Sequence, residues 1–149
     1  MKKFLGILIL GLLWCNFSFS KSMMSLNQYI LKNDNWTKDP ISLVYVFKRC
    51  GAAYFYASAI TSKDAKVKKK LENTSDLALK FAHEVLMEQK NIKSTEASEI
   101  IDNALDNMIL KYSQDGNDYY ASTGNYTSNN YIEKDLSLCK GIIEAVYNN

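Results

Sequence analysis

Few side chains in this 149-residue sequence have the types and spacing that catalysis or cofactor binding requires. His83 is the only histidine, and a helical bundle can use a histidine with a methionine as axial ligands of haem. Met87 lies one turn along the same predicted helix, so a ligand facing His83 would have to come from another segment. The sequence also has no C-x-x-C-H motif for covalent haem attachment. His83 is therefore a candidate ligand, and the alternative is a histidine at the edge of a buried helix face.

Metal binding and nucleophilic catalysis both lack their usual spacing. Di-metal bundles use a Glu-x-x-His unit on two helices, whereas Lys80 stands three residues before the single histidine. The run Asp115–Asp118 places carboxylates near a glycine, but Tyr119 would occupy an oxygen-ligand position of a calcium loop. The sequence also has no Gly-x-Ser-x-Gly motif for a nucleophilic serine. We therefore expect no catalytic residues, no metal and no cofactor, and a protein that is not an enzyme.

The first twenty residues have the pattern of a cleaved signal peptide. A positive start, Met1–Lys3, is followed by the apolar run Phe4–Trp14 and by small residues in Ser18–Ser20. The apolar run is too short to span a hydrocarbon core of ~30 Å. The segment Leu8–Asn16 resembles leaders of exported proteins from small-genome marine alphaproteobacteria, and this resemblance implies a Gram-negative periplasm. We expect residues 1–20 to be removed and the rest to be periplasmic or secreted, with an uncleaved anchor as the alternative.

Removing this leader changes both the charge and the cysteine count. Two of the 18 basic side chains and none of the 16 acidic ones lie in residues 1–20, so the remaining chain is formally neutral. A neutral chain lacks the basic excess typical of nucleic-acid-binding domains, and we expect no nucleic-acid partner. Cys15 leaves with the leader, whereas Cys50 and Cys139 remain. An even pair in an oxidising compartment predicts a disulfide, with two free buried thiols as the alternative.

Helical periodicity dominates the rest of the sequence, and it predicts long helices at about 41–60, 65–89, 95–112 and 131–147. Asp39 followed by Pro40 is typical of a helix start, because the carboxylate caps the free amides and proline needs no amide partner. Ser94 is expected to cap the third of these helices. Asn130 with Glu133 three residues later resembles a capping box for the last one.

Four helices with mostly short connections predict one all-α domain over residues 21–149, with a four-helix bundle-like fold stapled by one disulfide. A Cys50–Cys139 bridge requires the first and last long helices to lie side by side, with Cα atoms roughly 4.4–6.8 Å apart. Lys48 and Arg49 lie in the middle of the first long helix and argue against a membrane-spanning segment. We expect no stable membrane span after signal cleavage.

The most distinctive segment is the tyrosine-rich stretch 113–130, which we predict to be a long loop. Rigid aromatic rings among small hydrogen-bonding residues are typical of adaptable binding surfaces, and long loops in compact domains are often functional. The candidate binding residues of this loop are Tyr119, Tyr120, Tyr126 and Tyr131. The alternative is that these tyrosines pack on the end of the bundle.

These observations favour a small exported helical protein that acts by binding, as an accessory subunit, inhibitor or adaptor. Its partner would be an unidentified protein or small ligand. The alternative hypothesis is a carrier of haem or another small ligand that uses the interior of the bundle.

Overall fold

The computed structural model describes residues 22–61 and 63–147, which form helices joined by short connections and contain no strand. The predicted signal peptide, residues 1–20, and Cys15 lie outside the described residues. The helices are α2 (Leu26–Lys32), α3 (Pro40–Ile60), α4 (Ala65–Lys90), α5 (Ser94–Thr123) and α6 (Tyr131–Tyr147). The predicted all-α, bundle-like fold is therefore confirmed, and the short helix α2 is added before the four long ones.

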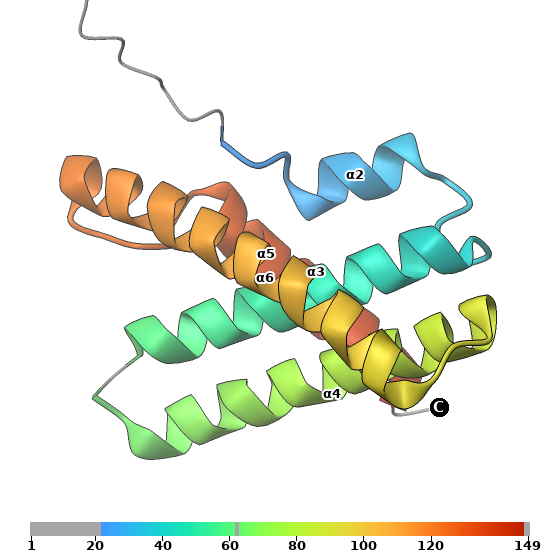
Figure 1. The fold of residues 1–149 in the computed structure, drawn as a ribbon. Coiled ribbons are helices and arrows are strands. Elements are labelled where there is room, and N and C mark those ends of the chain that lie inside the picture. Colours follow the sequence, from blue (N-terminus) through green and yellow to red (C-terminus); the bar gives the residue numbers. More distant parts are fainter. Residues whose placement is uncertain (1–21, 62, 148–149) are drawn as a thin grey trace, which may run out of the picture.

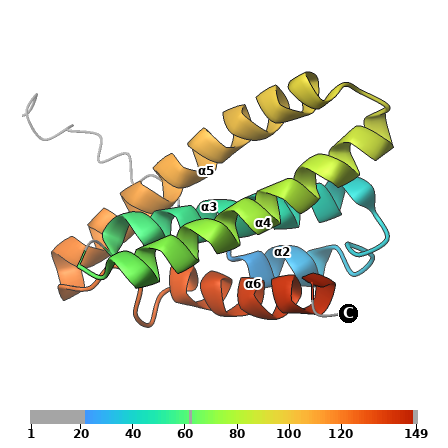
Figure 2. The same ribbon diagram turned by 90° about the horizontal axis from the view of Figure 1, so that it is seen from below.

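The helices are arranged in three layers. The middle layer is the antiparallel pair of α3 and α4, whereas α5 crosses one face of this pair obliquely (Figure 1). Figure 2 shows α2 and α6 together on the opposite face. Helix α3 contacts helices of both outer layers, which explains why most of its residues are buried. The sequence indicated this position, because α3 is apolar on most of its sides.

Helices α3 and α4 approach closely because Gly51 has no side chain. A Cβ atom at Gly51 would lie 2.5 Å from Cδ2 of Leu79 on α4, a distance that real contacts do not tolerate. The hydroxyl of Ser75 donates a hydrogen bond of 2.8 Å to the Gly51 carbonyl across the same interface. Packing of the middle layer therefore favours glycine at position 51, because a side chain there would displace that of Leu79.

At two of the three predicted helix starts, the predicted capping side chain accepts hydrogen bonds from amides of the first turn. The Asp39 carboxylate accepts a hydrogen bond of 3.0 Å from the Ser42 amide, with proline at the start of α3. The Asn130 side chain accepts hydrogen bonds from the Ile132 and Glu133 amides at 2.8 and 3.3 Å. The Glu133 carboxylate, however, binds the amide of residue 129 rather than that of Asn130.

The predicted cap of α5 is wrong. Lys93 precedes the helix and makes no side-chain capping bond, and Ser94 is already the first helical residue. The Ser94 hydroxyl instead lies 3.3 Å from Nε2 of His83 on α4. A contact with the neighbouring helix has taken the place of the local cap.

The predicted loop 113–130 is also wrong over most of its length. Helix α5 continues to Thr123 and ends at Gly124, whose φ of 74° is left-handed and suits glycine. The connection to α6 is therefore only residues 124–130. The helix continues because Asp115 and Gly116 are buried in the interior, so tertiary contacts outweigh the low helix propensity of this polar stretch.

The predicted disulfide is confirmed. Cys50 on α3 and Cys139 on α6 are bonded, with Cα atoms 5.4 Å apart and a sequence separation of 89 residues. Both side chains are fully buried. The bridge joins the middle layer to the α2–α6 layer, and it fixes α6 against α3 beside the groove described below.

Candidate functional site

An apolar groove lies between α6 and the 33–39 loop. Helices α2 and α6 lie together on this side of the molecule (Figure 2). Its volume is about 500 Å³, within the range typical of small-molecule sites. Thr37 is the one polar residue in its lining. The lining residues come from the loop and from α3, α4 and α6, and they are Trp36, Thr37, Leu43, Phe47, Phe81, Leu138, Gly141, Ile142, Ala145 and Val146.

Small residues on α6 keep the groove open. Gly141 and Ala145 are four residues apart, so they lie on the same face of the helix. A Cβ atom added at Gly141 would meet no heavy atom within 4 Å. In contrast to Gly51, Gly141 is not in close contact with a neighbour, and a methyl group at this position would enter open space.

Trp36 is held on the opposite wall by consecutive turns. Its amide donates a hydrogen bond of 2.8 Å to the Asn33 carbonyl, and the Asn35 carbonyl accepts from the amides of Lys38 and Asp39 at 2.8 and 3.0 Å. The loop between α2 and α3 is therefore folded back on itself by its own backbone. The backbone that carries the Trp36 indole is therefore ordered before any ligand binds, which reduces the entropy that binding has to overcome.

A second, more polar hollow adjoins the groove along α6. Leu138 and Gly141 line both spaces, and the second is completed by Asn27 of α2 together with Lys134 and Ser137 of α6. Its volume is about 440 Å³. The two spaces together are apolar at one end and polar at the other.

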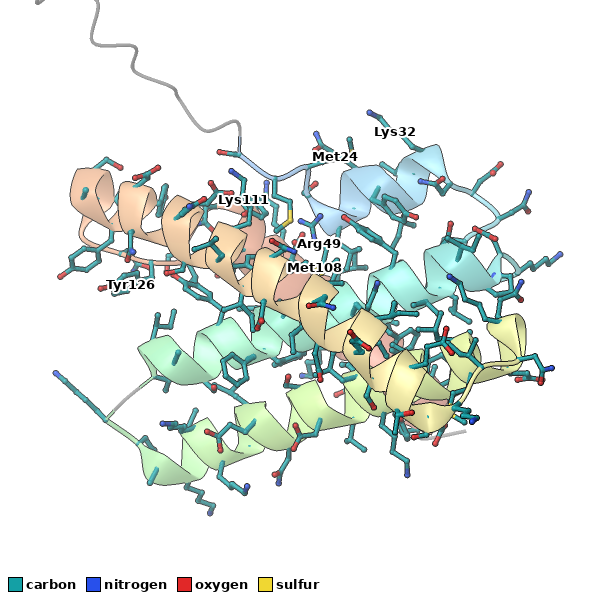
Figure 3. All side chains as sticks on the ribbon, viewed as in Figure 1. Met24, Lys32, Arg49, Met108, Lys111 and Tyr126 are labelled. Carbon is teal, nitrogen blue, oxygen red and sulfur yellow. A yellow bond between two sulfur atoms is a disulfide. The ribbon has the colours of Figure 1, made fainter. Side chains whose placement is uncertain are left out.

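A buried ion pair lies elsewhere, in the interior of the molecule. The Asp135 carboxylate receives hydrogen bonds from Arg49 Nη2 at 2.6 Å, Arg49 Nε at 3.0 Å, the Tyr112 hydroxyl at 2.7 Å and the Leu26 amide at 2.7 Å. The Arg49 and Asp135 side chains are 0% exposed. Figure 3 shows Arg49 where α5 crosses α3. This centre therefore joins α2, α3, α5 and α6.

A second buried acid, Asp115 of α5, extends the network. Its carboxylate accepts hydrogen bonds from the Tyr131 hydroxyl at 2.6 Å and from the Met23 amide at 3.1 Å. Burial and the Asp115 carboxylate raise the pKa of Tyr131, and burial with the nearby Asp135 raises the pKa of Tyr112. Both phenols therefore stay protonated and act as donors. Neither acid lines the groove, so the network holds the helices together.

The sequence patterns did not predict this network, since Arg49 alone indicates only a charge that argues against a membrane span. The available signal was the only arginine of the sequence, placed in the middle of a largely apolar helix, because a charge that becomes buried needs a partner. Asp135 gave a matching signal, since it lies between Ile132 and Cys139 on the apolar face of the last helix.

The four candidate tyrosines are divided between two places. The Tyr119 hydroxyl donates a hydrogen bond of 2.7 Å to the Ser128 carbonyl and fastens the short connection to α5. Tyr120, which is 46% exposed, stacks on Tyr126 with ring centroids 4.3 Å apart. Figure 3 shows Tyr126 at the far end of α5. Tyr131 instead turns toward the buried Asp115, so three of the four lie at the end of the α5–α6 hairpin.

His83 lies between α4 and the start of α5. Its Nε2 is 3.1 Å from the Ser94 carbonyl and 3.3 Å from the hydroxyls of Ser94 and Ser98. The groove lining contains neither His83 nor a methionine. In this structure the imidazole therefore connects two helices, and the structure does not bring it to the candidate site.

Other kinds of site are also absent from the part of the chain that the structure describes. Residues 22–61 and 63–147 hold no group of three or more His, Cys, Asp or Glu side chains placed to bind a metal ion. None of the helices described has the length and apolar character needed to cross a membrane. The function has to be inferred from the geometry of the chain, because comparison with protein families, with curated proteins and with solved structures found no match.

Proposed function

We propose that this chain is an exported helical binding protein, and that the groove between α6 and the 33–39 loop holds the apolar part of a small ligand. The groove itself is the observation that carries the proposal: about 500 Å³ of open space with an almost wholly apolar lining. Burying apolar ligand surface there is favourable by about 25 cal/mol per Å². Export follows from the predicted leader and fits an oxidised cysteine pair.

Binding is favoured over catalysis because the groove lining contains no Asp, Glu, His, Lys, Arg or Cys. General acid–base or nucleophilic chemistry needs such a group within hydrogen-bond reach of the substrate. The buried acids Asp115 and Asp135 accept hydrogen bonds from internal donors and lie outside the groove lining. A ligand in the groove therefore contacts mainly apolar side chains, which favour binding over reaction.

Trp36 provides a direct assay. The chain has two tryptophans, Trp14 and Trp36, so a Trp14→Phe background leaves one reporter, located in the groove. We expect 1-dodecanol, below its solubility limit, to change Trp36 fluorescence saturably. Gly141→Phe places a ring in the open space and is expected to weaken binding at least tenfold, whereas Gly141→Ala is the matched control and keeps most of the volume. Equal binding by the Gly141→Phe variant would refute the assignment.

A second candidate surface is the end of the α5–α6 hairpin, where the stacked pair of Tyr120 and Tyr126 is accessible. Stacked aromatic rings that reach solvent are typical contacts of protein-recognition surfaces. This role is tested by exchanging both residues for alanine and comparing the proteins captured from a periplasmic extract. The double variant keeps Tyr119, which closes the hairpin, and an unchanged set of captured proteins counts against this surface.

A further inference from the structure

We propose that the ligand of the groove is a free single-chain carboxylate amphiphile, with its hydrocarbon chain along the apolar groove and its carboxylate at Lys134. This inference rests on the proposed function, because it names the ligand of the same site. Its basis is the difference in polarity between the two adjoining spaces. The groove contains a single polar residue, Thr37, in its lining, whereas the adjoining hollow presents Asn27, Lys134 and Ser137.

The two spaces adjoin along α6. Leu138 and Gly141 line both, so a chain that passes over Gly141 would reach from one space into the other. Lys134, Leu138, Gly141 and Ala145 follow each other at helical spacing along one face of α6. An extended molecule on this face therefore has apolar walls along its length and a cation at one end.

The charge at the polar end is positive. Lys134 is exposed, and none of the ion pairs found among the described residues includes it. The hollow is not lined by any acidic residue. The amide of Asn27 and the hydroxyl of Ser137 add neutral hydrogen-bond donors beside the ammonium group. This combination matches a carboxylate, which accepts several hydrogen bonds and carries one negative charge.

The two parts of the ligand contribute differently. Each buried methylene is expected to strengthen binding about fourfold, until the groove is filled. The ion pair is exposed, so it contributes selectivity of about three- to fivefold and little affinity. A carboxylate should therefore bind more tightly than the alcohol of the same chain length, and the difference should depend on Lys134.

The test compares dodecanoate with 1-dodecanol, both as monomers, on the full chain in the Trp14→Phe background. We expect dodecanoate to bind about three- to fivefold more tightly, and Lys134→Gln to remove this preference without weakening dodecanol binding. Lys140→Gln is the matched control, since Lys140 lies on α6 but lines a different hollow and is 4.0 Å from Glu144. A series of carboxylates from eight to fourteen carbons should show the stepwise gain in affinity.

The possible results separate this inference from the function on which it rests. If dodecanol and dodecanoate bind equally and Lys134→Gln changes neither, the carboxylate assignment is overturned while the apolar groove stands. If neither binds, both proposals fail. A Trp36 response to vesicles of anionic phospholipid, with none to dodecanoate, would assign the face to a membrane surface. Concentration-dependent dimers that Gly141→Phe abolishes, again without a dodecanoate response, would assign it to a second copy of this chain. Each of these last two results overturns the inference.

Discussion

Replacing Asp135 by asparagine tests the buried ion pair with almost no change in side-chain size. Three hydrogen bonds reach Oδ2, two from Arg49 and one from Tyr112, and the Leu26 amide reaches Oδ1. An asparagine amide can place its oxygen on only one of these two sides, so its NH₂ group must face a donor on the other. At the same time the guanidinium, which is 0% exposed, loses its counter-charge.

The expected cost is about 3–5 kcal/mol, because an uncompensated buried charge is strongly destabilising. This cost is a large part of the free energy of unfolding of a typical domain, which is roughly 5–15 kcal/mol. Urea unfolding followed by far-ultraviolet circular dichroism, with the disulfide intact, gives the free energy of unfolding. Glu144→Gln is the matched control on the same helix. Its partner Lys140 is 69% exposed, so we expect a change within about 0.5 kcal/mol.

A double-mutant cycle separates the pair from its surroundings. Arg49→Met combined with Asp135→Leu removes both charges together, so the double variant should be more stable than the sum of the single costs predicts, by about 1–3 kcal/mol. The Tyr112 hydroxyl and the Leu26 amide still lose their acceptor, which prevents full recovery. If Asp135→Asn costs less than about 1 kcal/mol, the reasoning on this buried pair is refuted.

Three further predictions concern α6, the buried phenols and the disulfide. Gly141→Ala should raise the free energy of unfolding by about 0.5–1 kcal/mol, since helix propensity improves and the new methyl group meets open space; a lower melting temperature would contradict this. Burial raises the pKa of Tyr56 to about 12, and the pKa values of Tyr112 and Tyr131 are also raised. In the unfolded chain these tyrosines release protons near pH 10, whereas in the folded protein they keep them. The free energy of unfolding should therefore be highest below about pH 10 and fall above it by up to about 1.4 kcal/mol per pH unit for each tyrosine. Urea unfolding between about pH 8 and pH 11 measures the slope of the unfolding free energy against pH, and Tyr131→Phe should make this slope shallower. An equal slope in the variant would exclude Tyr131 as a contributor. Reducing Cys50–Cys139 should cost about 4–5 kcal/mol in the chain-entropy model, and alkylation under denaturant should label these two thiols only after reduction.

Local sequence patterns were sufficient to predict most of the helices. The starts of α3 and α6 follow from Asp39–Pro40 and Asn130, whose side chains bind amides only a few residues away. The end of α5 could not be found in this way, because the residues after Tyr112 are polar and contain a glycine. Their helical state depends on burial against other elements, and the sequence of the segment alone does not record such contacts.

The candidate site was harder to predict than the fold for the same reason. Cys50 and Cys139 could be paired because only two cysteines follow the leader. The groove, in contrast, combines Trp36, Phe81 and Gly141 from three separate segments, and no spacing in the sequence connects them. The tyrosine-rich stretch is distinctive in composition, but most of it continues α5, and the Tyr119 hydroxyl bonds to the Ser128 carbonyl of the short connection.

The bonds between α6 and the early part of the chain also constrain the order in which the protein can fold. Arg49 and Asp135 are separated by 86 residues, the two cysteines by 89, and Leu26 and Asp135 by 109. Contacts over such separations form slowly, and these cannot form until the last helix has been synthesised. For a chain exported as we propose, the interior would stay open until the whole sequence has crossed the membrane. Oxidation of the two thiols after export would then make the closure difficult to reverse.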